Sequence, residues 1–243
     1  MGSFKRGMKK FGAQVWELFK GSFAAMMMYF CAGSILMMLT LKENQLYWDG
    51  GKLAWTLVCG IAAAAYNGLV SYAQGGNAYE MLVSGNLKRL SADGYGGEIR
   101  MSSHKEAKEY RAWKGFVSGA FIAVWTVVVG LIFGFNQAAI DGQSISGGLG
   151  VLLLISFLLC GWAILPFWYS NLGGVSVSYF YSALLGLVPI VVSGVFYIVG
   201  AYGRRNKAIR EQEIADRAAR AQEEKVKKIN YGGLPGTKPK KRK

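Results

Sequence analysis

Long apolar stretches alternate along the chain with short polar segments. Five apolar runs reach the length that crosses a bilayer, which is about 20 residues for a hydrocarbon core about 30 Å thick. They occupy residues 21–41, 53–74, 115–137, 147–170 and 178–202, and none contains Asp, Glu, Lys, Arg or His. Core helices of a water-soluble protein are shorter and show a polar face. The pattern predicts an all-α, polytopic integral membrane protein with four or five transmembrane helices.

The polar segments complete the predicted organisation. Residues 1–20 space their apolar side chains as an amphipathic helix with basic residues and a tryptophan, which is typical of a helix lying in the membrane interface. The transmembrane domain covers 21–202 and includes a long polar loop, 75–114. The tail, 203–243, begins as a charged helix, and its last residues, GTKPKKRK, are predicted to be disordered.

The polar loop contains one recognisable start signal for a helix. Ser103 and Glu106 fit a capping box, in which each side chain hydrogen-bonds a backbone amide at the start of a helix. We therefore expect a helix from about residue 104 that runs directly into the third span. Residues 78–90 are expected to extend the second span.

The distribution of charge conflicts with the number of spans. The net charge is +14, and the N-terminus, the middle loop and the tail hold 26 of the 28 Lys and Arg residues. The positive-inside rule assigns these three segments to the cytoplasmic side of the cell membrane. Five spans, however, would place the two termini on opposite sides. Either 147–202 crosses only once, through a segment broken near Pro166 or Pro189, or the tail lies outside. We favour the cytoplasmic tail.

The basic residues flanking the apolar runs predict contact with the anionic headgroups of the lipid bilayer. Nucleic acid is the less favoured partner, because positive charge near membrane spans has this simpler explanation. The candidate headgroup contacts are Lys5, Lys9, Lys10, Arg204, Arg205, Lys240, Lys241, Arg242 and Lys243.

Candidate chemistry is sparse. The single histidine, His104, lies in the polar loop, and Cys31, Cys59 and Cys160 lie within apolar runs without the spacing of a metal site. Spans without ionisable groups provide no proton relay. The sequence therefore predicts no catalytic residue, no cofactor and no metal ion.

Small residues and one amide are the candidate packing sites. Gly130 and Gly134 form a GxxxG pair in the third run, and small residues spaced in this way let helix backbones approach closely. Gly60, Ala64 and Gly68 form a similar stripe in the second run. Asn67 is expected to hydrogen-bond a neighbouring helix. Packing within the chain is the favoured interpretation, and contact with another subunit is the alternative.

Three functions fit these features, and an enzyme that uses carboxylates of the polar loop is the least favoured. The favoured one is a non-catalytic membrane scaffold or accessory subunit that acts through its cytoplasmic loop and basic tail, with a membrane-protein partner or a second copy of the chain. The alternative is a small transporter or channel component, in which the region near Pro166–Gly174 or Pro189 lines a cavity that Asn67 faces.

Overall fold

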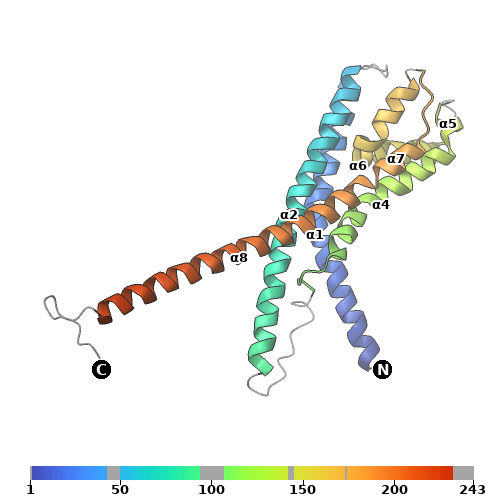
Figure 1. Ribbon diagram of the computed structural model, residues 1–243. Coiled ribbons are helices and arrows are strands. Elements are labelled where there is room, and N and C mark those ends of the chain that lie inside the picture. The colour runs from blue at the N-terminus through green and yellow to red at the C-terminus, as the bar shows by residue number, and fades with distance from the viewer. Residues whose placement is uncertain (1, 43–49, 94–106, 142–144, 173, 232–243) are drawn as a thin grey trace. The chain divides into compact units, whose positions relative to one another are not determined.

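A computed structural model of the chain describes residues 2–42, 50–93, 107–141, 145–172 and 174–231. Five of its helices are long and apolar enough to cross a membrane, and the described residues contain no strand. The predicted all-α, polytopic fold is thus confirmed. The helices are α1 (Gly2–Lys42), α2 (Gly50–Asp93), α4 (Trp113–Phe135), α5 (Gln137–Asp141), α6 (Gly147–Leu172), α7 (Phe180–Leu185) and α8 (Val188–Tyr231) (Figure 1).

The chain divides into two compact units. Met1–Ala201 forms the membrane unit, and Tyr202–Lys243 forms the tail. The boundary falls inside α8, which continues without a break into the charged sequence of the tail. Each unit is described by itself below.

Within the membrane unit, α1 and α2 form an antiparallel pair (Figure 1). The Gln74 side chain of α2 donates a 2.6 Å hydrogen bond to the carbonyl of Gly21 in α1. We call the end that holds 7–21, 74–93 and 107–114 the basic end. The opposite end, which holds the start of α2 and residues 135–141, is the neutral end.

Helix α6 bends sharply at Cys160, whose φ of −128° and ψ of 15° lie outside the helical region. Gly161 follows the bend, and glycine has a low helix propensity. Pro166 has no N–H to donate to the carbonyl one turn earlier. Both residues therefore make the helix less stable near the bend. Phe157 and Trp168 lie on opposite sides of the bend, with ring centroids 5.3 Å apart. Eleven residues of straight helix would separate them by about 16 Å. Helix α6 therefore folds back on itself.

Both ends of α6 lie at the neutral end. Asn171, near its C-terminus, donates to the carboxylate of Asp141 at 3.4 Å. Leu149, near its N-terminus, packs in the same apolar cluster as Ile140. The bend itself lies deeper, where Gly33 of α1 contacts the backbone of α6. Each half of α6 is about 20 Å long, which is too short to cross a 30 Å hydrocarbon core alone.

Helices α7 and α8 together run antiparallel to α4. Phe180 at the start of α7 meets Phe135 at the neutral end, with ring centroids 5.2 Å apart. At the basic end Tyr197 of α8 stacks on Tyr110, just before α4, with centroids 5.4 Å apart. The predicted single span 178–202 is thus interrupted between Leu185 and Val188, and it ends at the basic end, where α1 begins.

Two packed apolar clusters hold the membrane unit together. The first joins α1, α2 and α6 around Tyr29, Ala63 and Trp162, and the Tyr29 and Trp162 rings lie 4.8 Å apart. The second joins α4, α6 and the segment before α7 around Val129, Phe133 and Tyr179. The two halves of α6 contribute to both clusters, so the folded-back helix forms part of the core.

The polar loop differs from its prediction. Residues 78–93 extend α2, as expected, but 107–112 form turns and bends, so the expected helix from 104 into the third span is wrong over these residues. The Lys114 ammonium donates hydrogen bonds to the carbonyls of Ala107 and Glu109, and these bonds hold the segment in a turn. The capping box at Ser103–Glu106 lies outside the described residues.

The two terminal segments keep their predicted helical character. Residues 2–42 are one helix with no break at residue 20, so the segment predicted to lie in the interface continues directly into the first span. Its interfacial position stays a prediction. In the tail the helix ends at Tyr231, just before Gly232–Gly233. Residues 232–243, which include Lys240–Lys243, lie outside the described residues.

Candidate functional site

Glycines bring α4 into close contact with α7 and α8 along its whole length. A Cβ added at Gly130 would lie 2.6 Å from Ser182 Oγ and 2.7 Å from Ala183 N, and one at Gly134 would lie 2.6 Å from the Phe180 ring. The predicted GxxxG pair therefore faces α7. Close backbone approach of this kind is a main source of helix association in membranes.

A second GxxxG pair, Gly115 and Gly119, was missed because it lies at the polar edge of the third apolar run. A Cβ at Gly119 would lie 2.5 Å from Ile190 Cα, and one at Gly115 would lie 2.6 Å from Tyr197 Cβ. The motif is visible in the amino-acid sequence, and only its position beside Lys114 concealed it.

The predicted stripe in α2 is divided between two neighbours. Gly60 faces Trp162 of α6, where an added Cβ would make an ordinary 3.7 Å contact, and Gly68 faces the Phe196 ring of α8 at 3.3 Å. Ala64 is half-buried between them. Further along α2, Gly75 lies directly against the Tyr197 carbonyl. The tightest contact of α2 is therefore beyond the predicted stripe.

The side-chain amide of Asn67 forms hydrogen bonds with α8. Its Nδ2 donates to the Pro189 carbonyl at 3.4 Å, and its Oδ1 accepts hydrogen bonds from Ser193 Oγ at 2.9 Å and Ser71 Oγ at 3.4 Å. All three polar side chains are buried. The amide thus links α2 to the first turn of α8, which contains Pro189.

A polar cluster at the neutral end fixes the return of α6. Asn171 accepts the Val177 amide hydrogen at 2.6 Å, and Gln137 donates to the Val177 carbonyl at 3.1 Å. Tyr179, the residue before α7, is buried and hydrogen-bonds with Asn171.

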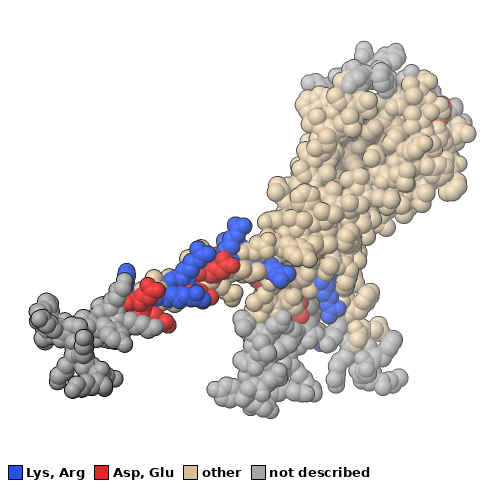
Figure 2. Space-filling model, in the orientation of Figure 1, with Lys and Arg blue, Asp and Glu red and all other residues tan. Residues whose placement is uncertain are grey.

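The basic end carries most of the charged side chains that the structure describes in the membrane unit. Lys9, Lys20, Lys108, Arg111 and Lys114 all lie there, and Figure 2 shows the Lys and Arg side chains gathered at this end of the unit. Lys20 forms a 3.2 Å ion pair with Glu17 and lies 5.4 Å from the centroid of the Trp16 ring.

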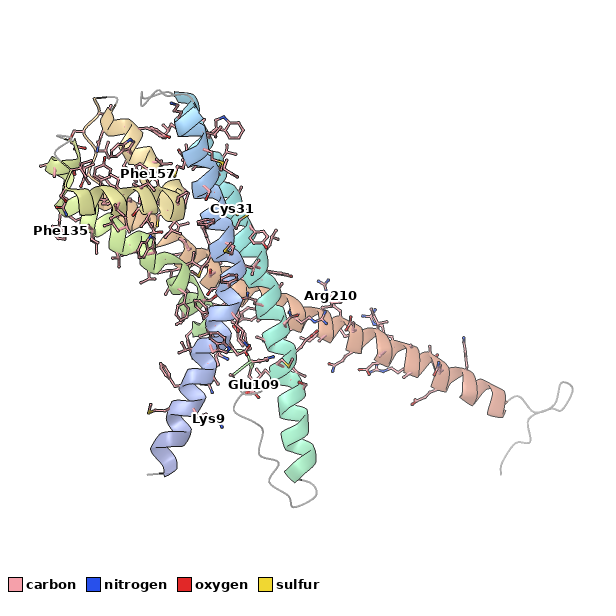
Figure 3. All side chains as sticks on the ribbon, turned by 180° about the vertical axis from the view of Figure 1, so that it is seen from behind. Lys9, Cys31, Glu109, Phe135, Phe157 and Arg210 are labelled. Carbon is pink, nitrogen blue, oxygen red and sulfur yellow. The ribbon has the colours of Figure 1, made fainter. Side chains whose placement is uncertain are left out.

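Residues 107–114 are anchored against the bundle. The buried Lys114 ammonium donates to the carbonyls of Ala107 at 2.7 Å and Glu109 at 2.6 Å. The Tyr110 amide donates to the Ala78 carbonyl of α2 at 3.0 Å. In Figure 3, Glu109 lies beside α1 and α2. The Lys114 ammonium, the Tyr110 amide and the stacking of Tyr110 on Tyr197 therefore hold this segment, which hydropathy alone assigned to a loop.

A pocket of about 380 Å³ opens at the basic end. Its polar lining residues are Glu17, Lys20, Gln74, Asn77, Lys108 and Lys114, and Leu18, Met81 and Tyr197 add apolar surface. A second cavity of about 290 Å³ lies between α1, α4 and α6, near the bend, and its lining is mainly apolar.

The predicted headgroup residues fall into three groups. Lys9 is exposed in α1, and Arg204 and Arg205 are exposed in the tail. The side chains of Lys5 and Lys10, and all of Lys240, Lys241, Arg242 and Lys243, lie outside the described residues. Their contact with lipid headgroups stays a prediction.

No family model, curated protein or solved structure matches the chain. Among the described residues, no group of three or more His, Cys, Asp or Glu side chains is arranged to hold a metal ion.

Proposed function

We propose that the protein is a non-catalytic membrane scaffold or accessory subunit, which binds lipid headgroups and a membrane-protein partner through its basic end and tail. The observation that carries this proposal is the separation of roles along the chain. Glycines and Asn67 are used in packing within the membrane unit. Charged side chains gather at one end and along the tail, where 203–243 hold fourteen basic and five acidic residues.

The proposed orientation places the basic end on the cytoplasmic side of the cell membrane. It is supported by the positive-inside rule and by the return of α6 to the neutral end. If α6 enters and leaves on one side, α1, α2, α4 and the α7–α8 pair make four crossings. The N-terminus, the polar loop and the tail then share one side, which removes the conflict between charge and hydropathy.

The alternative function is a small transporter or channel component. It is favoured by the bend in α6 and the interruption between α7 and α8, because broken helices line the substrate sites of many transporters. Against it, Asn67 does not face an open cavity but bonds to Pro189 and Ser193 of α8. One side of the bend in α6 packs against Gly33 of α1, and the cavity beside the bend has a mainly apolar lining that suits a polar solute poorly.

Affinity purification of the full chain from native membranes, in a mild detergent, tests the scaffold role. We expect a partner in stoichiometric amount. Replacing Arg204, Arg205, Lys207 and Arg210 with Gln should reduce its recovery several-fold, because a basic surface attracts an acidic one. Lys52→Gln, at the neutral end, is the matched control and should leave recovery unchanged.

Recovery of the chain without a partner would contradict the scaffold role. Solute-dependent flux through the purified protein in liposomes would then support the transporter alternative.

A further inference from the structure

The pocket at the basic end combines features that suit an anion. Three of its lining residues carry ammonium groups, Lys20, Lys108 and Lys114, and one carries a carboxylate, Glu17. The excess of positive charge is thus part of the pocket itself and not only of the surrounding surface. Asn77 adds an exposed amide with two N–H donors.

The base of the pocket lies at the start of a membrane span. Lys114 is the second residue of α4 and is only 3% exposed. Its ammonium lines the pocket and donates to the carbonyls of Ala107 and Glu109, which are neutral acceptors. A buried ammonium is stable only when it is well satisfied by hydrogen bonds or an opposite charge, so an anion bound here would be strongly attracted.

The rim of the pocket carries residues typical of the headgroup layer. Lys20 is exposed and lies over Trp16, and tryptophan concentrates at the boundary between hydrocarbon and water. Lys108 is also exposed and lines the pocket. A ligand that contacts both the rim and the base must therefore reach the pocket at the depth of the headgroups.

We propose that this pocket binds the phosphate of an anionic lipid headgroup. The inference rests on the proposed function, which places the basic end on the cytoplasmic side, where anionic lipids are concentrated. Lysine is a common phosphate ligand that acts as a point charge. The volume of about 380 Å³ is at the small end of ligand pockets, which suits a headgroup better than a folded protein segment. The apolar surface of Leu18 and Met81 suits the glycerol and the first carbons of the chains.

Binding of short-chain lipids to the purified full chain tests this inference. The probe is dioctanoyl phosphatidylglycerol in a neutral detergent at low salt, and the comparison is dioctanoyl phosphatidylcholine, which carries no net charge. The variant replaces Lys20 and Lys108 with Gln and retains Lys114, which holds residues 107–114. Lys9→Gln is the matched control, because Lys9 is exposed on the same helix but does not line the pocket.

We expect phosphatidylglycerol to bind more tightly than phosphatidylcholine, and its apparent Kd to rise about thirty-fold in the double variant, since each basic residue near a membrane contributes about 1 kcal/mol. Lys9→Gln should change it less than two-fold. Equal affinity of the wild type and the double variant for phosphatidylglycerol would overturn the inference, as would equal affinity for the two lipids.

Two further arms identify the source of the anion. Glycerol 3-phosphate that binds as tightly as the lipid, with the same dependence on Lys20 and Lys108, would overturn the lipid and assign the pocket to soluble phosphate esters. A poly-glutamate peptide that binds with that dependence, while phosphatidylglycerol does not, would assign it to an acidic protein segment. All arms use the purified chain without a partner, so their failure is distinguishable from failure of the scaffold role.

Discussion

Individual glycines differ in how much their missing side chain matters. At Gly119 an added Cβ would meet backbone atoms of α8, 2.5 Å from Ile190 Cα and 2.6 Å from the Pro189 carbonyl oxygen. At Gly134 the neighbour is the Phe180 ring, which can rotate. At Gly60 the nearest atom is 3.7 Å away. A backbone cannot move without shifting a whole helix, so the three positions should tolerate a methyl group in the order 60, 134, 119.

We therefore expect Gly119→Ala to lower the thermal stability of the full chain in detergent. Overpacking of this kind costs about 1–3 kcal/mol, which corresponds to a fall in Tm of roughly 3–10 °C for a protein of this size. Gly60→Ala is the matched control and should change Tm by about 1 °C or less. Equal values of Tm for the two variants would contradict the close contact between α4 and α8.

Asn67 allows a second test at the residue scale. Asn67→Leu removes the hydrogen bonds to Pro189 and Ser193 and leaves the Ser193 hydroxyl without its acceptor. Hydrogen bonds between helices in membranes contribute about 1 kcal/mol each, so we expect Tm to fall by roughly 3–6 °C. Asn77→Leu, at an exposed position on the same helix, should leave Tm nearly unchanged. A larger fall for Asn77→Leu would show that the amide at 67 does not link α2 to α8.

At the scale of the element, the path of α6 decides how many times the chain crosses the membrane. Its two halves meet at Cys160, and the contact between Phe157 and Trp168 requires the chain to reverse direction. Backbone groups exposed at such a bend must be satisfied inside the protein, because lipid supplies no hydrogen-bond partner. The bend is covered by α1, where Gly33 lies against the backbone of Leu158 and Gly161.

Single cysteines test the return of α6. In a chain whose three native cysteines are replaced by Ala, Gly148→Cys lies in the first turn of α6, Ser176→Cys follows the helix, and Gly7→Cys marks the basic end; all three positions are exposed. We expect a membrane-impermeant maleimide to label 148 and 176 from one side of sealed vesicles and 7 from the other. Labelling of 148 and 176 from opposite sides would mean that α6 crosses the membrane.

The sequence predicts the helices of this fold better than their paths. Each apolar run became helical, because about 20 apolar residues in hydrocarbon satisfy their backbone only as a helix. Hydropathy did not distinguish a spanning α6 from one that folds back, since both bury the same residues. The reversal depends on contacts between residues far apart in the chain, such as Asn171 with Asp141.

The predicted helix from 104 failed over 107–112 for a similar reason. The capping signal is local, whereas the turn is held by the Lys114 ammonium and by Ala78 of α2. The pocket could not be predicted at all, because Lys20, Gln74 and Lys108 come from three distant segments. Among the predicted sites, Asn67 and the GxxxG pair were visible because each carries its own chemical signature within one apolar run.

At the scale of the whole molecule, the charge distribution and the helix paths lead to one arrangement. The membrane unit begins with α1 at the basic end, and Ala201, its last residue, follows Tyr197 and Gly200, which contact Gly75 and Tyr72 near the same end of α2. A chain whose membrane unit begins and ends on one side makes an even number of crossings. In the orientation proposed above, the lysines and arginines of the N-terminus and the tail face the same compartment, in agreement with the positive-inside rule.

Fusions at the two termini test this arrangement. Green fluorescent protein, which becomes fluorescent in the cytoplasm, is joined ahead of residue 1 of the full chain in one fusion and after Lys243 in a second. We expect both fusions to fluoresce, because the positively charged termini remain on the cytoplasmic side. Alkaline phosphatase, which is active only outside the cytoplasm, should be inactive at both positions. The contrary result is an active phosphatase after Lys243 together with a fluorescent N-terminal fusion. It would require five crossings, and the tail would then not share a compartment with the polar loop.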